Sequence, residues 1–208
     1  PGVVLASAAK EYMKVYGVLV GKKPVVFTNN DSAYETAIEF KKNNINPIVL
    51  DSRQDSNSEI IKEAKSLGID IKFSHVVVAA KGYKKVKSCD IAEISEDKQN
   101  LNQIKNIECD CICVSGFWTP TVHLASQSGG KTKFKEEIDA FVPDKSKQKE
   151  VTLGSANGVF TLEETLKTSF DKGFELSKEI TNNNNSQQIP KVSEKKHSKH
   201  DKFWCVPL

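Results

Sequence analysis

The fold is decided by residues 25–51, which read VVFTNNDSAYETAIEFKKNNINPIVLD. The stretch opens with a short apolar run, which is typical of a buried strand in a parallel sheet, and a polar turn follows it. Residues 33–42 then place apolar side chains at helical spacing, and a second apolar run ends at Asp51. The stretch predicts a strand, a turn, a helix and a second strand, the unit from which dinucleotide-binding folds are built.

Similar elements follow on the C-terminal side. They are an amphipathic helix at 58–67, a third strand at 69–73, antiparallel strands at 75–80 and 84–94, and a buried strand at 109–114. This order predicts an α/β fold, a Rossmann-like dinucleotide-binding domain of the two-domain pyridine nucleotide/flavoprotein oxidoreductase type. On the N-terminal side, residues 3–20 have apolar side chains near helical spacing, which predicts a helix.

The residues after 116 differ in character. They begin with a loop rich in turn formers and continue with a short strand at 149–153 and a helix at 161–180, where Thr161 and Glu164 make a capping box. Residues 181–202 are rich in Asn, Gln, Ser and Lys, which is typical of a mobile linker. Residues 203–208 are apolar again and predict the start of another domain.

The composition excludes several classes of protein. No run approaches the ~18 consecutive apolar residues of a membrane helix. The first residues show neither a signal peptide nor an initial Met, which predicts a start inside a longer protein. The net charge is +3, but Arg53 is the only arginine among 30 basic residues, whereas nucleic-acid readers rely on arginine. We therefore expect neither a membrane protein nor a nucleic-acid-binding protein.

Three of the five cysteines, Cys109, Cys111 and Cys113, alternate within one apolar run. Side chains two residues apart point to the same face of a strand, which suits packing better than disulfides and favours a reducing cytoplasm. Metal and iron–sulfur sites use C-x₂-C-type spacing, so we expect no metal site. His75 is expected to be structural and His123 is the better functional candidate. No arrangement of a catalytic triad stands out, so no catalytic residue is predicted.

The turn after the first strand is the main candidate site. A dinucleotide fold carries G-x-G-x-x-G/A there, so that backbone N–H groups and a helix N-terminus meet the pyrophosphate. Thr28, Asn30 and Ala33 occupy these positions, so both leading glycines are missing, although Asn can adopt a positive φ. The hydroxyl of Thr28 or Ser32 could bind phosphate directly.

Asp51 ends the second strand, where an acid accepts a hydrogen bond from the ribose of a dinucleotide. An acid at this position favours NAD over NADP, whereas the nearby Arg53 favours the opposite. In the alternative interpretation, residues 29–32 only cap the following helix. On the motif alone, a nucleotide site and a simple cap are both open.

Several longer strings of residues are far more specific than this motif. They are PGVVLASAA at 1–9, VVFTNNDSAY at 25–34, VSGFWTPTVHL at 114–124, SQSGG at 126–130, GSANG at 154–158 and WCVP at 204–207. Together they resemble the alpha subunit of heterotetrameric sarcosine oxidase, over roughly residues 1–180 and again near the C-terminus. The family itself carries the turn without glycines, so the resemblance accounts for their absence.

The resemblance implies a part of an amine-oxidising flavoenzyme complex. The family oxidises sarcosine to glycine and passes the one-carbon unit to tetrahydrofolate or releases it as formaldehyde, with hydrogen peroxide as co-product. NAD is expected in the alpha subunit, FAD in the beta subunit and covalent FMN between subunits, and the expected partners are the beta, gamma and delta subunits. The chain would be an internal piece of the alpha subunit, without oxidase activity on its own.

The resemblance also divides the chain into five parts. Residues 1–21 would end a first nucleotide-binding half-domain, 22–116 form an NAD-binding-like Rossmann domain, 117–180 return to the first half-domain, 181–202 form a flexible linker, and 203–208 start a truncated folate-binding, aminomethyltransferase-like domain. The expected cofactor-binding residues come from two of these parts: Thr28, Asn30, Ser32, Asp51 and Gly116 from the second, and Gly154, Ser155 and Asn157 from the third.

Two placements of NAD are open. The nucleotide lies either at the turn after residue 28 or against an absent N-terminal finger, with residues 154–158 closing that site. Related flavoproteins carry a Gly-Asp pair before the last helix, and Ser155 or Asn157 replaces its Asp here.

Two alternative functions remain. One is the alpha subunit of a related proline or opine dehydrogenase, whose relatives carry cysteine clusters for iron–sulfur centres. The other is a non-catalytic scaffold with a vestigial Rossmann unit, which predicts no affinity for nucleotides.

Overall fold

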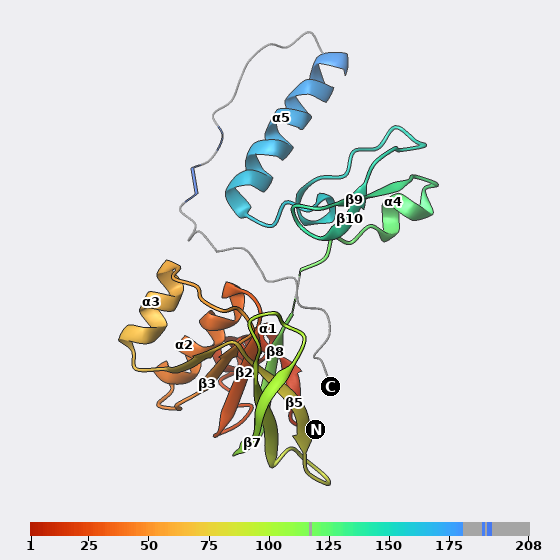
Figure 1. The fold of residues 1–208 in the computed structure, drawn as a ribbon. Coiled ribbons are helices and arrows are strands. Elements are labelled where there is room, and N and C mark those ends of the chain that lie inside the picture. The colour runs from red at the N-terminus through yellow and green to blue at the C-terminus, as the bar shows by residue number, and fades with distance from the viewer. Residues whose placement is uncertain (117, 181–188, 190, 193–208) are drawn as a thin grey trace. The chain divides into compact units, whose positions relative to one another are not determined.

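The computed structural model describes residues 1–116, 118–180, 189 and 191–192, and they fall into two units (Figure 1). Unit 1 comprises the described residues up to 116, and unit 2 comprises those from 118 onward. Apart from residues 189, 191 and 192, the expected linker at 181–202 lies outside the described residues, as does the expected domain start at 203–208.

Unit 1 consists of alternating strands and helices followed by a run of strands. Its elements are β1 (Val3–Leu5), α1 (Ala6–Tyr16), β2 (Pro24–Thr28), the 3₁₀ turn η1 (Asp31–Ala33), α2 (Tyr34–Lys42), β3 (Ile48–Asp51), α3 (Glu59–Ser66), β4 (Asp70–Phe73), β5 (His75–Lys81), β6 (Ser88–Ile94), β7 (Leu101–Glu108) and β8 (Cys111–Ser115). Five strands form a parallel sheet in the order β1-β8-β2-β3-β4, and β5, β6 and β7 form an antiparallel sheet. The predicted α/β fold is confirmed.

The parallel sheet is covered on both faces. Val26 and Val49 enter a core with residues of α1, α2 and α3. Their neighbours Val25 and Leu50 point to the other face and pack with residues of β6 and the loops beside it. Because the central strands are buried on both faces, they read as continuous apolar runs without polar alternation.

The expected helix over residues 3–20 is wrong at both ends. Val3–Leu5 form β1, which pairs with β8, and α1 ends at Tyr16, after which Gly17 adopts φ 64°. Val is a strong strand former, and pairing with β8 decides the conformation of this short apolar run. In this structure residues 1–16 are built into unit 1, and their membership of a preceding half-domain stays a prediction.

Cys109 does not share a face with Cys111 and Cys113. Strand β8 begins only at Cys111, because Asp110 turns the chain and accepts hydrogen bonds from the backbone N–H groups of residues 22 and 23, at 2.8 and 2.7 Å. Cys111 and Cys113 pack in the core beneath the helices, whereas Cys109 packs with Cys89 on the other face. These four of the five cysteines are buried.

The antiparallel sheet has one strand more than expected. Strand β6 begins at Ser88 rather than at residue 84, and β7 follows it after a turn. Residues 101–108 read LNQIKNIE, and most of their side chains are exposed, so they give little of the apolar alternation by which a strand is recognised.

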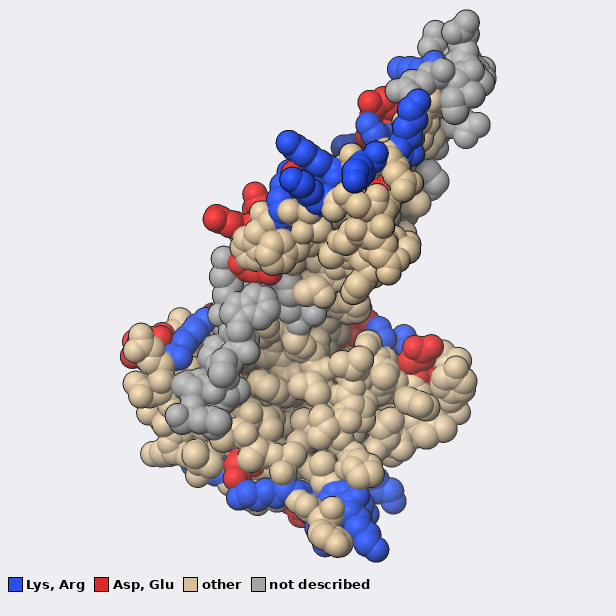
Figure 2. Space-filling model, turned by 90° about the vertical axis from the view of Figure 1, so that its right-hand side faces the viewer, with Lys and Arg blue, Asp and Glu red and all other residues tan. Residues whose placement is uncertain are grey.

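Unit 2 is a smaller group of elements. They are α4 (His123–Gln127), β9 (Thr132–Lys135), β10 (Ala140–Pro143), the 3₁₀ turn η2 (Gly154–Asn157) and α5 (Leu162–Ile180). The expected helix is confirmed, and the backbone N–H of Glu164 donates to Thr161 Oγ1 at 3.4 Å, as one half of a capping box. No strand forms at 149–153; the β9–β10 hairpin stands in the preceding segment instead. Figure 2 shows lysine side chains gathered on one face of this unit.

Candidate nucleotide-binding site

Three neighbouring strands end at the same edge of the parallel sheet. Thr28 at the end of β2 is in register with Asp51 at the end of β3 and with Ser115 at the end of β8. In open parallel sheets, ligands bind outside this carboxyl edge, beside the starts of the following helices. The fold therefore brings two of the predicted residues, Thr28 and Asp51, to the edge where a nucleotide is expected.

The turn after β2 is held by its own side chains. The backbone N–H of Asn30 donates to Thr28 Oγ1 at 3.1 Å. Asn30 Oδ1 accepts from the backbone N–H and the hydroxyl of Ser32, at 3.0 and 2.6 Å. Asn30 thereby caps η1, which leads directly into α2. The cap expected for the helix thus belongs to the 3₁₀ turn before it, because Ala33 at the N-cap of α2 makes no side-chain hydrogen bond.

Asn30 also joins the turn to the neighbouring strand. Its side-chain Nδ2 donates to the hydroxyl of Ser115 at 3.2 Å and to the carbonyl oxygen of Gly116. The hydroxyls of Ser32 and Ser115 lie 3.2 Å apart. Thr28, Asn30, Ser32 and Gly116, all predicted from the sequence, thus gather in one place. Ser32 and Ser115 are half-buried and Gly116 is exposed, so this hydroxyl pair lies at the surface.

The turn does not have the backbone conformation of a glycine finger. Asn30 has φ −150° and ψ 172°, which is extended and not the positive φ that the sequence allows. The side chains of Thr28 and Asn30 are buried at two of the positions where glycines leave room for a pyrophosphate, and Asn29 between them is buried as well. These residues do not fit a dinucleotide held in a glycine cradle. The half-buried hydroxyls of Ser32 and Ser115 are the polar groups that this turn presents near the surface.

Asp51 is fully buried, and protein donors surround its carboxylate. Its Oδ1 accepts from the backbone N–H and from Nε of Arg53, both at 3.0 Å. Its Oδ2 accepts from the hydroxyl of Tyr34 and from Nη2 of Arg53, both at 2.7 Å. Nη1 of Arg53 donates to Asp31 at 2.8 Å. The position expected for a ribose hydroxyl is therefore taken by the protein itself.

Burial and charge determine the protonation states of Tyr34 and Arg53, the two donors around Asp51. Burial, and then the nearby charge of Asp51, raise the pKa of Tyr34, so its hydroxyl stays protonated and donates. Burial by itself lowers the pKa of Arg53, but the hydrogen bonds and charges of Asp51 and Asp31 outweigh it, and the net change is upward. The guanidinium stays charged between two carboxylates.

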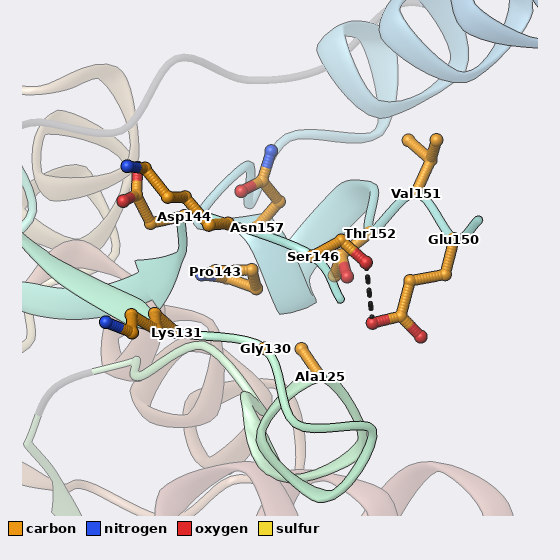
Figure 3. A pocket seen from close by; sticks show the side chains of 11 residues that line it. Ala125, Gly130, Lys131, Pro143, Asp144, Ser146, Glu150, Val151, Thr152 and Asn157 are labelled. Atoms are coloured by element: carbon orange, nitrogen blue, oxygen red, sulfur yellow. Dashed lines mark hydrogen bonds between the residues drawn. The ribbon is translucent and has the colours of Figure 1, made fainter. Parts of the chain in front are cut away.

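The remaining predicted residues, Gly154, Ser155 and Asn157, lie in η2 of unit 2. Asn157 lines a cavity of about 200 Å³ (Figure 3). Lys131, Asp144, Ser146, Glu150 and Thr152 also line it. A larger hollow of about 470 Å³ lies at the amino ends of β2 and β3 in unit 1. Neither hollow includes the turn after β2 or Asp51.

Neither His75 nor His123 takes part in the turn after β2. His75 Nδ1 lies 2.6 Å from the carbonyl oxygen of Phe73, in keeping with the structural role expected for it. His123 begins α4 and is exposed. Within the described residues, no group of three or more His, Cys, Asp and Glu side chains could hold a metal ion. Of the helices in the described part of the chain, none has the length and apolarity needed to cross a membrane.

Sequence reasoning missed three residues of this region: Asp31, Tyr34 and Ser115. Ser115 had a usable signal, because it ends a strand that had to lie beside the first strand of the unit. Asp31 and Tyr34 had none, since only the folded chain shows that Arg53, about twenty residues away, turns back toward them.

The fold resembles that of two solved structures, a thioredoxin reductase and an L-proline dehydrogenase. The structure is similar to thioredoxin reductase of T. acidophilum, with a TM-score of 0.51 and 16% identity, over 75% of this chain and 52% of that one. It is also similar to L-proline dehydrogenase of P. horikoshii, with a TM-score of 0.53 and 21% identity, over 86% of this chain and 30% of that one. No protein-family model matches the chain.

Sequence comparison identifies the relatives more narrowly. The chain is 33% identical over 170 residues to sarcosine oxidase subunit alpha of Corynebacterium sp. (strain P-1), which is 81% of this chain and 17% of that protein. The same subunit of Rhizobium meliloti (strain 1021) is 29% identical over 158 residues, which is 75% of this chain and 15% of that one. The resemblance to sarcosine oxidase alpha subunits is thus confirmed, and the chain spans about a sixth of their length.

Proposed function

We propose that this chain is the dinucleotide-binding part of a sarcosine oxidase alpha subunit and that it binds NAD at the carboxyl edge of its parallel sheet. The observation that carries the proposal is the pair of hydroxyls of Ser32 and Ser115, which lie 3.2 Å apart beside the start of η1 and α2. Hydroxyl groups and the N-terminal N–H groups of a helix are suitable donors for phosphate oxygens. The fold and the similarity to sarcosine oxidase alpha subunits support the same conclusion.

The residues at this edge have different roles in the proposal. Ser115 donates its hydroxyl to a phosphate oxygen, and Ser32 gives up its hydrogen bond to Asn30 Oδ1 in order to donate a second one. The exposed Gly116 leaves the approach to both open. Thr28 and Asn30 hold the turn in shape through the hydrogen bonds described above. Asp51 acts on Arg53 rather than directly on the nucleotide. Gly154, Ser155 and Asn157 remain proposed contacts of a nucleotide in unit 2.

The activity of the whole protein follows as a wider proposal, since the chain spans only 17% of its corynebacterial relative. In the complete complex, sarcosine would be oxidised to glycine, with the one-carbon unit passed to tetrahydrofolate or released as formaldehyde, and with hydrogen peroxide formed. FAD, FMN and the beta, gamma and delta subunits would belong to that assembly. This chain would contribute NAD binding to it.

A second candidate is a vestigial Rossmann scaffold that binds no nucleotide. Two observations favour it: the turn has no glycine cradle, and the carboxylate of Asp51 is closed by Arg53 and Tyr34. The two candidates differ in one measurable property, the affinity of the folded chain for NAD.

Calorimetric titration of the 208-residue chain with NAD tests the proposal. We expect saturable binding that Ser32→Ala weakens at least about tenfold, because a hydrogen bond to a charged group contributes about 1.5–3 kcal/mol. Ser66→Ala is the matched control: it removes an exposed hydroxyl that donates to the carbonyl of Glu63 at the end of α3. A chain that is folded by circular dichroism yet binds no NAD would refute the proposal in favour of the scaffold. Equal affinities of the two variants would refute the location of the site.

A further inference from the structure

Four polar residues form a buried cluster where three elements of unit 1 meet. Asp31 belongs to η1, Tyr34 begins α2, and Asp51 and Arg53 lie at and just beyond the end of β3. None of the four is more than 6% exposed. The cluster therefore sits in the interior and joins the turn after β2 to the end of β3, where a ribose is expected.

Asp51 has no acceptor position to spare for a ligand. A carboxylate offers about four acceptor positions. Asp51 receives hydrogen bonds from the backbone N–H, Nε and Nη2 of Arg53 and from the hydroxyl of Tyr34. A ribose hydroxyl would have to displace one of these donors, and a buried donor left without its partner is costly.

Arg53 is equally engaged. Its Nε and Nη2 donate to Asp51, and its Nη1 donates to Asp31. In NADP-binding folds a nearby arginine accommodates the 2′-phosphate, but here all three guanidinium nitrogens already face carboxylates. Two carboxylates around one guanidinium leave this trio with a net negative charge, which repels an additional phosphate.

We propose, on the basis of the proposed function, that the charged cluster of Asp31, Asp51 and Arg53 determines the choice between NAD and NADP, without a hydrogen bond from the ribose to Asp51. Asp51 is then a positioning residue, because it acts by holding Arg53 in place. The site admits NAD because protein donors already satisfy the carboxylate of Asp51, so binding does not require a hydrogen bond from the ribose to Asp51. It rejects NADP because the 2′-phosphate meets negative charge and no available arginine.

The first test uses the wild-type chain and therefore does not depend on any variant folding. Calorimetry compares NAD with an analogue whose adenosine ribose lacks the 2′-hydroxyl. We expect the two dissociation constants to agree within about twofold, since that hydroxyl has no acceptor in Asp51. An analogue that binds tenfold more weakly than NAD would overturn this inference and leave the proposed function standing. A folded chain that binds neither ligand would instead refute the proposed function, and the selectivity with it.

The second test changes the charge of the cluster. Asp51→Asn keeps the shape of the side chain, removes one negative charge and releases part of the guanidinium, while Asp31 still holds Nη1. We expect NADP to bind about tenfold more tightly than to the wild type and NAD to bind with unchanged affinity. Tyr34→Phe is the control for charge, because it removes a hydrogen bond to the same carboxylate without changing its charge, and the affinity for NADP should therefore stay at the wild-type value. A loss of NAD affinity in a folded Asp51→Asn variant, with NADP unaffected, would show that Asp51 binds the ribose and would overturn the inference.

Discussion

Three buried thiols of unit 1 have their pKa raised when the chain folds. Burial, and then the neighbouring thiol of Cys109, raise the pKa of Cys89 to about 12. Burial also raises the pKa of Cys109. In the pair of Cys111 and Cys113, whose Sγ atoms lie 3.7 Å apart, the hydrogen bond from Cys113 and then burial raise the pKa of Cys113. Cys89, Cys109 and Cys113 therefore stay protonated in the folded chain near pH 9, where the unfolded chain ionises its thiols. The hydrogen bond from Cys113 instead lowers the pKa of Cys111.

The stability of unit 1 should therefore fall in alkali. For Cys89 the stabilisation is fully present below about pH 9 and is lost as the pH rises toward 12, because only the unfolded state releases the proton there. One such group changes the free energy of unfolding by up to about 1.4 kcal/mol per pH unit. Urea unfolding at pH 7.5, 9 and 10.5 should show a decline that Cys89→Ala makes shallower, although this variant starts less stable because of the cavity it leaves. Identical pH slopes for the variant and the wild type would contradict this account.

At the scale of residues, the sequence predicts where a side chain lies in the fold better than it predicts the hydrogen-bond partners of that side chain. The acid at the end of β3 could be expected at Asp51, because the length of the strand–turn–helix unit fixes where that strand stops. Its partners could not, because Tyr34 lies 17 residues and Asp31 lies 20 residues away along the chain, and only tertiary packing brings Arg53 between them. For the same reason Asn30 could be assigned a place in the turn but not its bonds to Ser115 and Gly116.

At the scale of elements, two glycines of unit 2 differ in what they do. Gly158 ends η2 with φ 77°, and a Cβ added there would lie 2.4 Å from Ile138 Cδ1 and 3.1 Å from Val142 Cγ1. Gly173 lies inside α5 with no positive φ, and a Cβ there would meet no atom within 4 Å. Substitution by alanine should therefore lower the stability of unit 2 at Gly158 and raise it at Gly173.

We expect Gly158→Ala to destabilise unit 2 by about 1–2 kcal/mol, the cost of a left-handed conformation in a residue with a Cβ. Gly173→Ala should stabilise it by about 0.5–1 kcal/mol, because alanine loses less conformational entropy in a helix interior. Thermal unfolding followed by circular dichroism compares both variants with the wild type. If the midpoints of the two variants shift in the same direction, this interpretation of the turn is incorrect.

The sequence predicts an element when the pattern of its own residues determines its structure. It does not predict an element whose structure depends on pairing with a distant strand. The amphipathic pattern of residues 59–66 and the capping box before α5 act within one element, so α3 and α5 appear where expected. Strand β1 depends on pairing with β8, more than a hundred residues later, and β7 depends on pairing with β6. Neither β1 nor β7 shows this pairing in the hydrophobic periodicity of its own residues.

At the scale of the whole molecule, the buried apolar residues are divided unevenly between the units. Unit 1 has two cores, one on each face of its parallel sheet. Among the described residues of unit 2, the buried hydrophobic side chains are Ala125, Ala140 and Val142, two of them small. No described side chain of α5 is fully buried. Because burial of apolar surface is the main stabilising contribution, unit 2 has much the weaker source of stability.

Native-state hydrogen exchange should expose this difference. We expect backbone amides of α5 to exchange at least about tenfold faster, relative to their intrinsic rates, than those of α3, since local opening requires little apolar surface to be exposed. Helix α3 is a suitable control: it also faces solvent on one side, but Ile60, Ile61 and Ala64 anchor it in a core. Mass spectrometry of peptides from the 208-residue chain resolves the two helices. Protection of α5 equal to that of α3 would mean that unit 2 gains its stability from something other than its own buried side chains.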